Sequence, residues 1–116
     1  MIMRGIKYTP SQDSRLTISG PNVVIFPEYK KASADSKAKG ITPFMSTLRR
    51  RSPDYLDPCL NCHSKLREVQ ALIQAVQTGA DEALMLDVNG FVSTCNATNL
   101  FIMKNMNVWI ATINIA

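Results

Sequence analysis

Residues 79–101 read GADEALMLDVNGFVSTCNATNLF, and this segment decides the fold of the chain. Gly79 suits the position just after a helix, where a left-handed backbone favours glycine. The short apolar and β-branched runs ALMLD and FVSTC are typical of strands, and VNG separates them. Because Asn89 and Gly90 both tolerate a positive φ, we predict a hairpin with a two-residue turn at these positions. The segment therefore predicts the end of a helix followed by antiparallel strands.

A helix is predicted directly before this segment, over residues 62–78. Apolar residues recur there at spacings of three and four, with Leu72 beside them, as on one face of a helix. Ser64 can cap the helix start through its hydroxyl. We expect the apolar face to pack on the sheet. The residues of this face are Leu66, Val69, Ile73 and Val76.

Strands are also predicted outside the central segment. The run NVVIF, which ends before Pro27, has the pattern of a short buried strand. Pro43 lacks an amide proton, so the strand that contains it should lie at a sheet edge or form a bulge. Residues 30–40 should form a loop or a frayed helical turn that ends at Gly40. The predicted strands cover residues 1–5, 22–26, 41–48, 83–87, 91–95, 100–104 and 108–111. We expect the aromatic side chains in the core, namely those of Phe26, Phe91, Phe101 and Trp109.

These elements predict an α+β fold: a mainly antiparallel sheet with one main helix at about 62–78. The length of 116 residues suits one domain, and 46% apolar with 19% charged residues is typical of a globular chain. No apolar run is long enough to cross a bilayer, and the N-terminus lacks a signal-peptide core. We therefore expect a soluble, cytoplasmic protein with no membrane partner.

The net charge of +4 comes from two local clusters of basic residues. Lysines concentrate in residues 30–39, and three arginines occupy residues 49–51. No aromatic side chains alternate with them and no nucleic-acid motif accompanies them, so we expect a solvated surface and no nucleic-acid partner. Three cysteines are an odd number, which argues against a disulfide framework.

The order of elements and motifs resembles the cofactor-side hairpin of the class IV (fold type IV) pyridoxal-phosphate enzymes. This family includes branched-chain and D-amino acid aminotransferases and aminodeoxychorismate lyase. Arg4-Gly5 resembles the end of an upstream strand of the same domain. The other residues that carry the resemblance are Gly79–Ala80–Asp81–Glu82–Ala83–Leu84, Asp87, Gly90, Val92, Ala97, Asn99, Leu100 and Phe101.

The resemblance implies that residues 1–116 are a partial large domain of such an enzyme. It implies pyridoxal 5′-phosphate as cofactor, amino acids and 2-oxo acids as substrates, and a homo-oligomer. In the family, a lysine before the helix forms the Schiff base with the cofactor. An ungapped count back from Glu82 places that lysine at Asn61, whose amide cannot form an imine. Lys65 is the nearest amine, about 6 Å further along a helix axis, and is the candidate catalytic residue.

Further site residues follow from the same resemblance. Thr94 stands where the family carries a glutamate against the pyridine nitrogen. A hydroxyl can hydrogen-bond that nitrogen but cannot hold a proton there by its charge. Asn96, Ala97 and Thr98 are expected to line the edge of the cofactor. Since family members are much longer, we expect a truncated aminotransferase-like protein that is inactive alone.

Two other functions remain open. The chain could be a non-catalytic scaffold or interaction remnant that keeps the fold. Alternatively, Cys59-Leu60-Asn61-Cys62-His63 matches the C-x-x-C-H pattern of c-type haem attachment. The same residues with Cys95 could form a zinc site, although the adjacent Cys62 and His63 rarely bind one tetrahedral ion together. The resemblance favours the aminotransferase interpretation.

Overall fold

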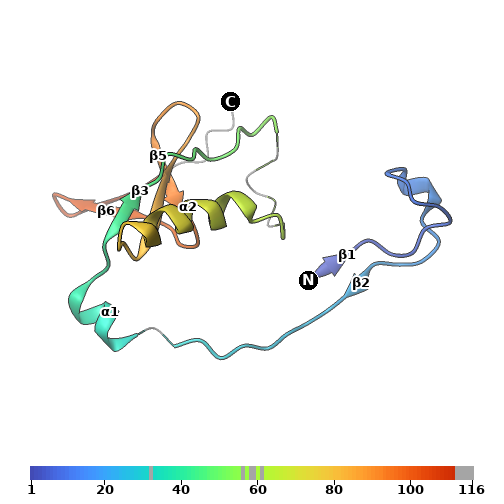
Figure 1. Cartoon of the computed structure of the whole chain (residues 1–116), viewed down its shortest axis with the longest axis horizontal. Coiled ribbons are helices and arrows are strands. Elements are labelled where there is room, and N and C mark those ends of the chain that lie inside the picture. The colour runs from blue at the N-terminus through green and yellow to red at the C-terminus, as the bar shows by residue number, and fades with distance from the viewer. Residues whose placement is uncertain (32, 56, 58–59, 61, 112–116) are drawn as a thin grey trace. The chain divides into compact units, whose positions relative to one another are not determined.

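The computed structural model describes residues 1–31, 33–55, 57, 60 and 62–111. The chain forms two compact units, Met1–Lys31 and Ala32–Ala116. In the first unit, β1 (Ile2–Met3) and β2 (Asn22–Val23) form an antiparallel pair, and the 3₁₀ helix η1 (Ser14–Leu16) lies in the loop between them (Figure 1).

The N-terminal strands differ from the prediction in length and burial. Only Asn22–Val23 of the predicted strand at 22–26 is paired, and Val23 is exposed. Ile25 and Phe26 are exposed as well, so the prediction of a buried strand is wrong. A β-branched run reports strand propensity, and it does not specify whether a second layer will cover the strand. Within the described residues of this unit, no buried side chain forms such a layer.

Gly5 of the Arg4-Gly5 pair has a structural role in this unit. A Cβ atom at this position would collide with the carbonyl oxygens of Ser19 and Gly20. The amide of the next residue, Ile6, donates a hydrogen bond of 2.8 Å to the Ser19 hydroxyl. Close approach of two backbone segments therefore requires glycine at position 5.

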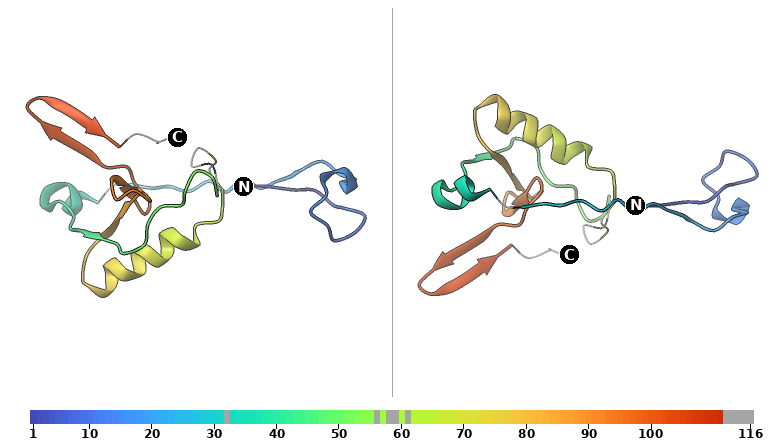
Figure 2. Two further views of the ribbon diagram at one scale, coloured as in Figure 1. Left: turned by 90° about the horizontal axis from the view of Figure 1, so that it is seen from above. Right: turned by 90° about the horizontal axis from the view of Figure 1, so that it is seen from below.

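The second unit contains the central segment and its partners. The strand order β3–β4–β5 forms one sheet, in which β3 is parallel and β5 antiparallel to β4. Strands β6 and β7 form a separate antiparallel hairpin, which projects away from α2 (Figure 2). The elements are α1 (Ala34–Lys39), β3 (Pro43–Met45), α2 (Leu66–Gln77), β4 (Glu82–Leu86), β5 (Val92–Cys95), β6 (Phe101–Lys104) and β7 (Asn107–Ile110).

This arrangement confirms the predicted fold class of antiparallel strands with one main helix. Pro43 lies in the edge strand β3, as its missing amide proton requires. The helical turn predicted to end at Gly40 is also present as α1, with Ser33 as its N-cap and Gly40 at φ 76°. None of the helices in the described residues is long and apolar enough to cross a bilayer.

Helix α2 starts later than predicted and ends as predicted. Its N-cap residue is Lys65, with no side-chain capping bond, so the prediction that Ser64 caps the helix is wrong. At the other end, Gly79 adopts φ 79° and its amide donates to the carbonyl of Val76. The amide of Ala80 donates to the carbonyl of Ala75. These two bonds are those of a Schellman motif, which closes a helix by a left-handed glycine.

The buried face of α2 is not the face that the apolar spacing predicts. Ala71 and Ala75 are fully buried and pack with Ala83 and Met85 of β4. Helix α2 therefore meets the sheet through alanines, which allow a close approach. Phe44, Leu48 and Ala80 complete this core as partly buried residues. The predicted core face is exposed instead: Leu66, Val69, Ile73 and Val76 are 50–66% exposed.

The central hairpin also differs in detail from the prediction. Its loop contains three residues, Val88, Asn89 and Gly90, because the amide of Asp87 bonds the carbonyl of Phe91 across it. Only Gly90 has a positive φ, 91°, and its amide donates to the carbonyl of Asp87 at 3.2 Å. The predicted two-residue turn at Asn89-Gly90 is therefore wrong. The Asp87 carboxylate fixes the loop by accepting from the amides of Asn89 and Phe91, each at 2.9 Å.

A two-residue turn occurs instead between β6 and β7. Asn105 and Met106 both have a positive φ there, 50° and 60°, and Lys104 pairs with Asn107. The hairpin carries two of the aromatic residues that we expected in the core, Phe101 and Trp109. The four aromatics are 59–78% exposed, so the predicted aromatic core is wrong; they are Phe26, Phe91, Phe101 and Trp109. Among the described residues of the second unit, no further layer covers this hairpin.

Candidate functional site

The loop after β5 is held by hydrogen bonds to one carbonyl oxygen. The carbonyl of Thr98 accepts from the Cys95 amide at 3.0 Å and from the Thr94 hydroxyl at 2.8 Å. Both donors lie on β5, so the chain folds back onto the strand that it has just left. Residues 94–98 thus form one compact loop, and it contains four of the five predicted site residues.

Asn96 and Glu82 connect this loop to β4. The Asn96 amide donates to the carbonyl of Ala83, and its side-chain oxygen accepts from the Ala83 amide, both at 2.8 Å. The Thr98 hydroxyl donates to the Glu82 carboxylate at 2.7 Å. Glu82 is 9% exposed, so this bond satisfies a largely buried acid. Sequence reasoning missed Glu82 as a site residue, although its place in the GADEAL motif was known.

Cys95 is buried between these groups. Burial raises the pKa of the Cys95 thiol, and the Glu82 carboxylate raises that pKa further, while a hydrogen bond with Thr98 opposes both. The thiolate is the nucleophilic form of cysteine, so the raised pKa keeps Cys95 protonated and unreactive near neutral pH.

We predict that Cys95 reacts much more slowly with iodoacetamide than Cys62 in the folded chain at pH 8. Cys62 is only partly buried, whereas Cys95 is 5% exposed. Peptide mass spectrometry after timed labelling measures both rates. In urea the two rates should converge, because unfolding removes both the burial and the Glu82 charge. Equal rates in the folded chain would show that the loop around Cys95 is open.

The predicted catalytic residue lies on the same side of the sheet as Thr94. Thr94 pairs with Met85 in the β4–β5 register, and opposite residues of such a pair share a face. Since Met85 packs against α2, Thr94 leaves β5 on the helix side. Lys65 stands at the N-terminal end of that helix and is exposed. Asn61, where the resemblance places the family lysine, lies outside the described residues.

Two polar clusters hold α2 over the sheet, and neither was predicted from the sequence. Arg50 forms an ion pair of 2.8 Å with Glu68, and both side chains are largely buried. The expectation that residues 49–51 are simply solvated is therefore wrong for Arg50. Gln74 accepts from the buried Ser46 hydroxyl at 2.8 Å and donates to the Thr47 hydroxyl at 2.9 Å. Both contacts link residues 18 or more positions apart, so no local pattern could reveal them.

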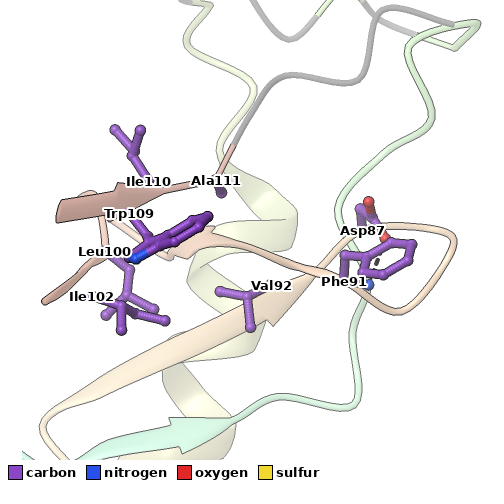
Figure 3. Close-up of a pocket in the computed structure, with 8 residues that line it drawn as sticks. All are labelled: Asp87, Phe91, Val92, Leu100, Ile102, Trp109, Ile110 and Ala111. Atoms are coloured by element: carbon purple, nitrogen blue, oxygen red, sulfur yellow. Dashed lines mark hydrogen bonds between the residues drawn. The ribbon is translucent and has the colours of Figure 1, made fainter. Parts of the chain in front are cut away.

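An apolar pocket of about 530 Å³ lies between the β4–β5 and β6–β7 hairpins. Trp109 and Val92 lie on its two sides, with Phe91 and Asp87 at one end (Figure 3). The Asp87 carboxylate is already bonded to the Phe91 amide. Leu100, Ile102, Ile110 and Ala111 complete the lining. None of the predicted site residues lines this pocket.

A metal or haem site gains no support from the part of the chain that the structure describes. Within it, no three His, Cys, Asp or Glu side chains group in a way that could hold a metal ion. Cys59 of the C-x-x-C-H motif lies outside the described residues, so the haem interpretation stays a prediction. Cys62 and Cys95 are both free thiols.

The described residues fit pyridoxal phosphate only in part. Thr94 and Thr98 offer hydroxyl oxygens, but each hydroxyl proton is already donated, to the Thr98 carbonyl and to Glu82. The Asn96 side-chain oxygen is also engaged within the loop. The loop can therefore support the edge of a ring chiefly through lone pairs and through the exposed Ala97. It supplies no carboxylate at position 94 and no amine.

Comparisons with known proteins identify the family of this chain. The family model of amino-transferase class IV matches residues 3–114. The chain is 34% identical over 107 residues to branched-chain-amino-acid aminotransferase-like protein 2 of Arabidopsis thaliana, covering 92% of this chain and 19% of that protein. It is 41% identical over 66 residues to a putative branched-chain-amino-acid aminotransferase of Methanocaldococcus jannaschii, covering 57% of this chain and 23% of that protein.

A solved structure has the same fold. It is the T.th. branched-chain amino acid aminotransferase complexed with N-(5′-phosphopyridoxyl)-L-glutamate, which matches with a TM-score of 0.59 and 26% identity. The match covers 61% of this chain and 24% of that one. The chain spans about a fifth of the length of its Arabidopsis relative. With a family match over nearly all of its residues, this chain belongs to the class IV aminotransferases.

Proposed function

We propose that this chain carries the cofactor-side scaffold of a branched-chain or D-amino acid aminotransferase and does not transaminate by itself. Residues 1–116 then form part of one large domain. In a complete site, amino acids and 2-oxo acids would be the substrates and pyridoxal phosphate the cofactor. The family match over residues 3–114 supports the scaffold, and the chemistry of the loop residues supports the lack of turnover.

The observation that carries this proposal is the commitment of the loop hydroxyls to the loop itself. The Thr94 hydroxyl donates to the Thr98 carbonyl at 2.8 Å, so a ligand nitrogen would meet only its lone pairs. A neutral hydroxyl also lacks the charge that would keep that nitrogen protonated. Asn61 is a second reason to expect no transamination, because its amide cannot form the imine that the lysine amine forms in the family.

The chain's own residues nevertheless suit the support of a cofactor. Asn96, through its two bonds to Ala83, fixes the end of β5 to β4. Glu82 holds Thr98 and so orients the loop backbone. Ala97 leaves room at the tip of the loop. When bound, pyridoxal phosphate would supply the electron-accepting ring, and Lys65 is the candidate amine on the same side of the sheet as Thr94.

We predict that purified chain mixed with pyridoxal phosphate forms no stoichiometric lysine adduct. The absorbance at roughly 410–430 nm, where such adducts absorb, should stay at the level given by scattered surface lysines. Borohydride reduction followed by peptide mass spectrometry should then find low labelling spread over several lysines. A transamination assay with branched-chain and D-amino acids should show no turnover.

Matched variants make this test specific. Lys65→Ala and Lys104→Ala each remove one exposed lysine, and we expect both to leave the absorbance and the labelling pattern unchanged. One equivalent of reduced adduct on Lys65, lost only in Lys65→Ala, would contradict the proposed inactivity. That result would still agree with the family assignment, because it would show that Lys65 serves in place of position 61.

A second candidate function is supported by the exposed apolar faces of the second unit. A non-catalytic scaffold would keep the fold and use its surface for association. Large apolar side chains are half or more exposed on both α2 and the β6–β7 hairpin, for example Ile73 and Trp109. Where such side chains adjoin, they can form a surface for association. The absence of turnover, together with specific association, would favour this second function.

A further inference from the structure

The loop between β4 and β5 contains the only asparagine of the chain that precedes a glycine, Asn89. Val88, Asn89 and Gly90 are all exposed, so water reaches the loop. Among the described residues, the side-chain amide of Asn89 has no hydrogen-bond partner, and only its backbone amide is bonded. An unbonded asparagine side chain beside a glycine can react with its own backbone, because glycine has no Cβ atom to obstruct the approach.

The reaction joins the Asn89 side chain to the backbone. The Gly90 backbone nitrogen loses its proton to the solvent and attacks Cγ of Asn89. A C–N bond forms, and the side-chain nitrogen takes up a proton and leaves as ammonia. Water then opens the resulting succinimide at either of its carbonyls, which gives aspartate or isoaspartate. Water is the only co-reactant, and a neutral amide becomes a carboxyl group that is ionised near neutral pH.

Three hydrogen bonds hold the backbone around the reacting nitrogen. The Gly90 amide donates to the Asp87 carbonyl at 3.2 Å. The amides on either side, those of Asn89 and Phe91, donate to the Asp87 carboxylate at 2.9 Å each (Figure 3). Bonds to a charged acceptor are the stronger kind, and these two are also the shorter ones. The Asp87 carboxylate therefore resists movement of the Gly90 nitrogen toward Asn89, and its charge opposes the negative charge that develops on that nitrogen.

We propose that Asn89 is a self-modification site, which converts to aspartate and isoaspartate, and that the Asp87 carboxylate restrains this conversion in the folded chain. The proposal does not depend on aminotransferase activity. Isoaspartate adds a backbone atom between the two amides that Asp87 holds, so their spacing changes and the loop loosens. The new carboxylate also forms near Arg49, whose Nη1 atom is 3.9 Å from a Cβ atom built at Gly90. The conversion therefore changes both the charge and the closure of the β4–β5 hairpin.

Incubation of the folded full chain at pH 8, followed by peptide mass spectrometry with electron-transfer fragmentation, measures the conversion at each asparagine. Asn105 is the internal control, because it is also exposed and lies in a hairpin turn but precedes a methionine. We expect Asn89 to convert at least about tenfold faster than Asn105, since a side chain on the following residue obstructs the attack. Conversion at Asn105 that is as fast as conversion at Asn89 would overturn the proposal.

Two variants test the restraint by Asp87. Asp87→Ala removes the acceptor and should speed conversion of Asn89 at least about fivefold, because the loss of one charged hydrogen bond changes a local opening equilibrium by such a factor. Asp87→Asn keeps an oxygen that can accept but lacks the charge, so its rate should lie between those of Asp87→Ala and the wild type.

Urea supplies a reference that does not rely on either variant to fold. In urea the wild type and Asp87→Ala should convert at one common rate, and that rate should exceed the rate of the folded wild type at least about fivefold, because the hydrogen bonds of the loop are lost. Circular dichroism at 222 nm identifies a variant that fails to fold. Two results would overturn the restraint: equal rates for folded Asp87→Ala and folded wild type, or a wild-type rate that is the same in buffer and in urea.

Discussion

Replacing Met85 by alanine is expected to lower the free energy of unfolding by about 2–3 kcal/mol. Met85 is the largest fully buried side chain in the described chain. Its neighbours in the core, Ala71, Ala75 and Ala83, have no side-chain atoms beyond Cβ with which to fill the space. Only the partly buried Phe44 and Leu48 could move into the cavity left by Met85→Ala, and the part that stays empty adds its own cost to the lost burial.

The control for this prediction is Met103→Ala on β6. Met103 is 79% exposed, so the same deletion should change the free energy of unfolding by less than about 0.5 kcal/mol. Urea unfolding followed by circular dichroism at 222 nm, where α2 gives most of the signal, measures both variants. If the two variants have the same free energy of unfolding, α2 is not held on the sheet by this core, and the packing described for β4 is wrong.

The existence of α2 was predictable, and its orientation was not. The 3–4 spacing of apolar residues correctly predicts a helix, because the period is a property of the helix itself. The same spacing does not say which layer the apolar face contacts. Here Ala71 and Ala75, which hydropathy patterns weight little, form the contact with the sheet. Helix identity is thus local information, whereas helix orientation depends on residues elsewhere in the chain.

Turn types show the same division. Asn89-Gly90 correctly predicts a hairpin, because Gly90 does adopt a positive φ. The loop is nevertheless one residue longer than predicted, since the Asp87 carboxylate accepts from the amides of Asn89 and Phe91 and shifts the closing pair to Asp87 and Phe91. Side-chain capping of this kind competes with the backbone preference of the dipeptide. The two-residue turn at Asn105-Met106 was harder to predict, because methionine rarely adopts a positive φ.

The sequence predicts which segment contains the candidate site, but it does not predict the hydrogen bonds that hold this segment in place. The motif placed Thr94, Asn96, Ala97 and Thr98 in one loop, which agrees with the compact loop in the structure. The role of those side chains was assigned by resemblance and stays a prediction. Glu82 was missed as a partner of that loop because its bond to Thr98 joins residues 16 positions apart. Long-range bonds of this kind require the fold before they can be seen.

Replacing Gly79 by valine should destabilise the second unit by about 2 kcal/mol. Gly79 adopts φ 79°, where a β-branched side chain clashes with its own backbone. Its amide and that of Ala80 close α2 through the carbonyls of Val76 and Ala75. Ala80 packs on the core directly after the turn, and Asp81 bonds Thr42 of the segment before β3. Strain at Gly79 is therefore transmitted to both the helix and the sheet.

Gly40→Val is the comparison variant, because Gly40 also ends a helix at a positive φ, 76°. Its ψ of −169° lies in a region that is essentially restricted to glycine, so valine is strained at this position as well. No heavy atom lies within 4 Å of a Cβ built at either glycine, so a difference between the variants cannot come from a direct clash with neighbours. Helix α1 has six residues and none is buried, so it can fray and release the strain. Helix α2 cannot unwind at Gly79 without exposing Ala75 and moving Ala80 from the core. We therefore expect urea unfolding at 222 nm to shift strongly for Gly79→Val and little for Gly40→Val. Equal shifts would mean that backbone strain alone sets the cost and that the end of α2 is not coupled to the core.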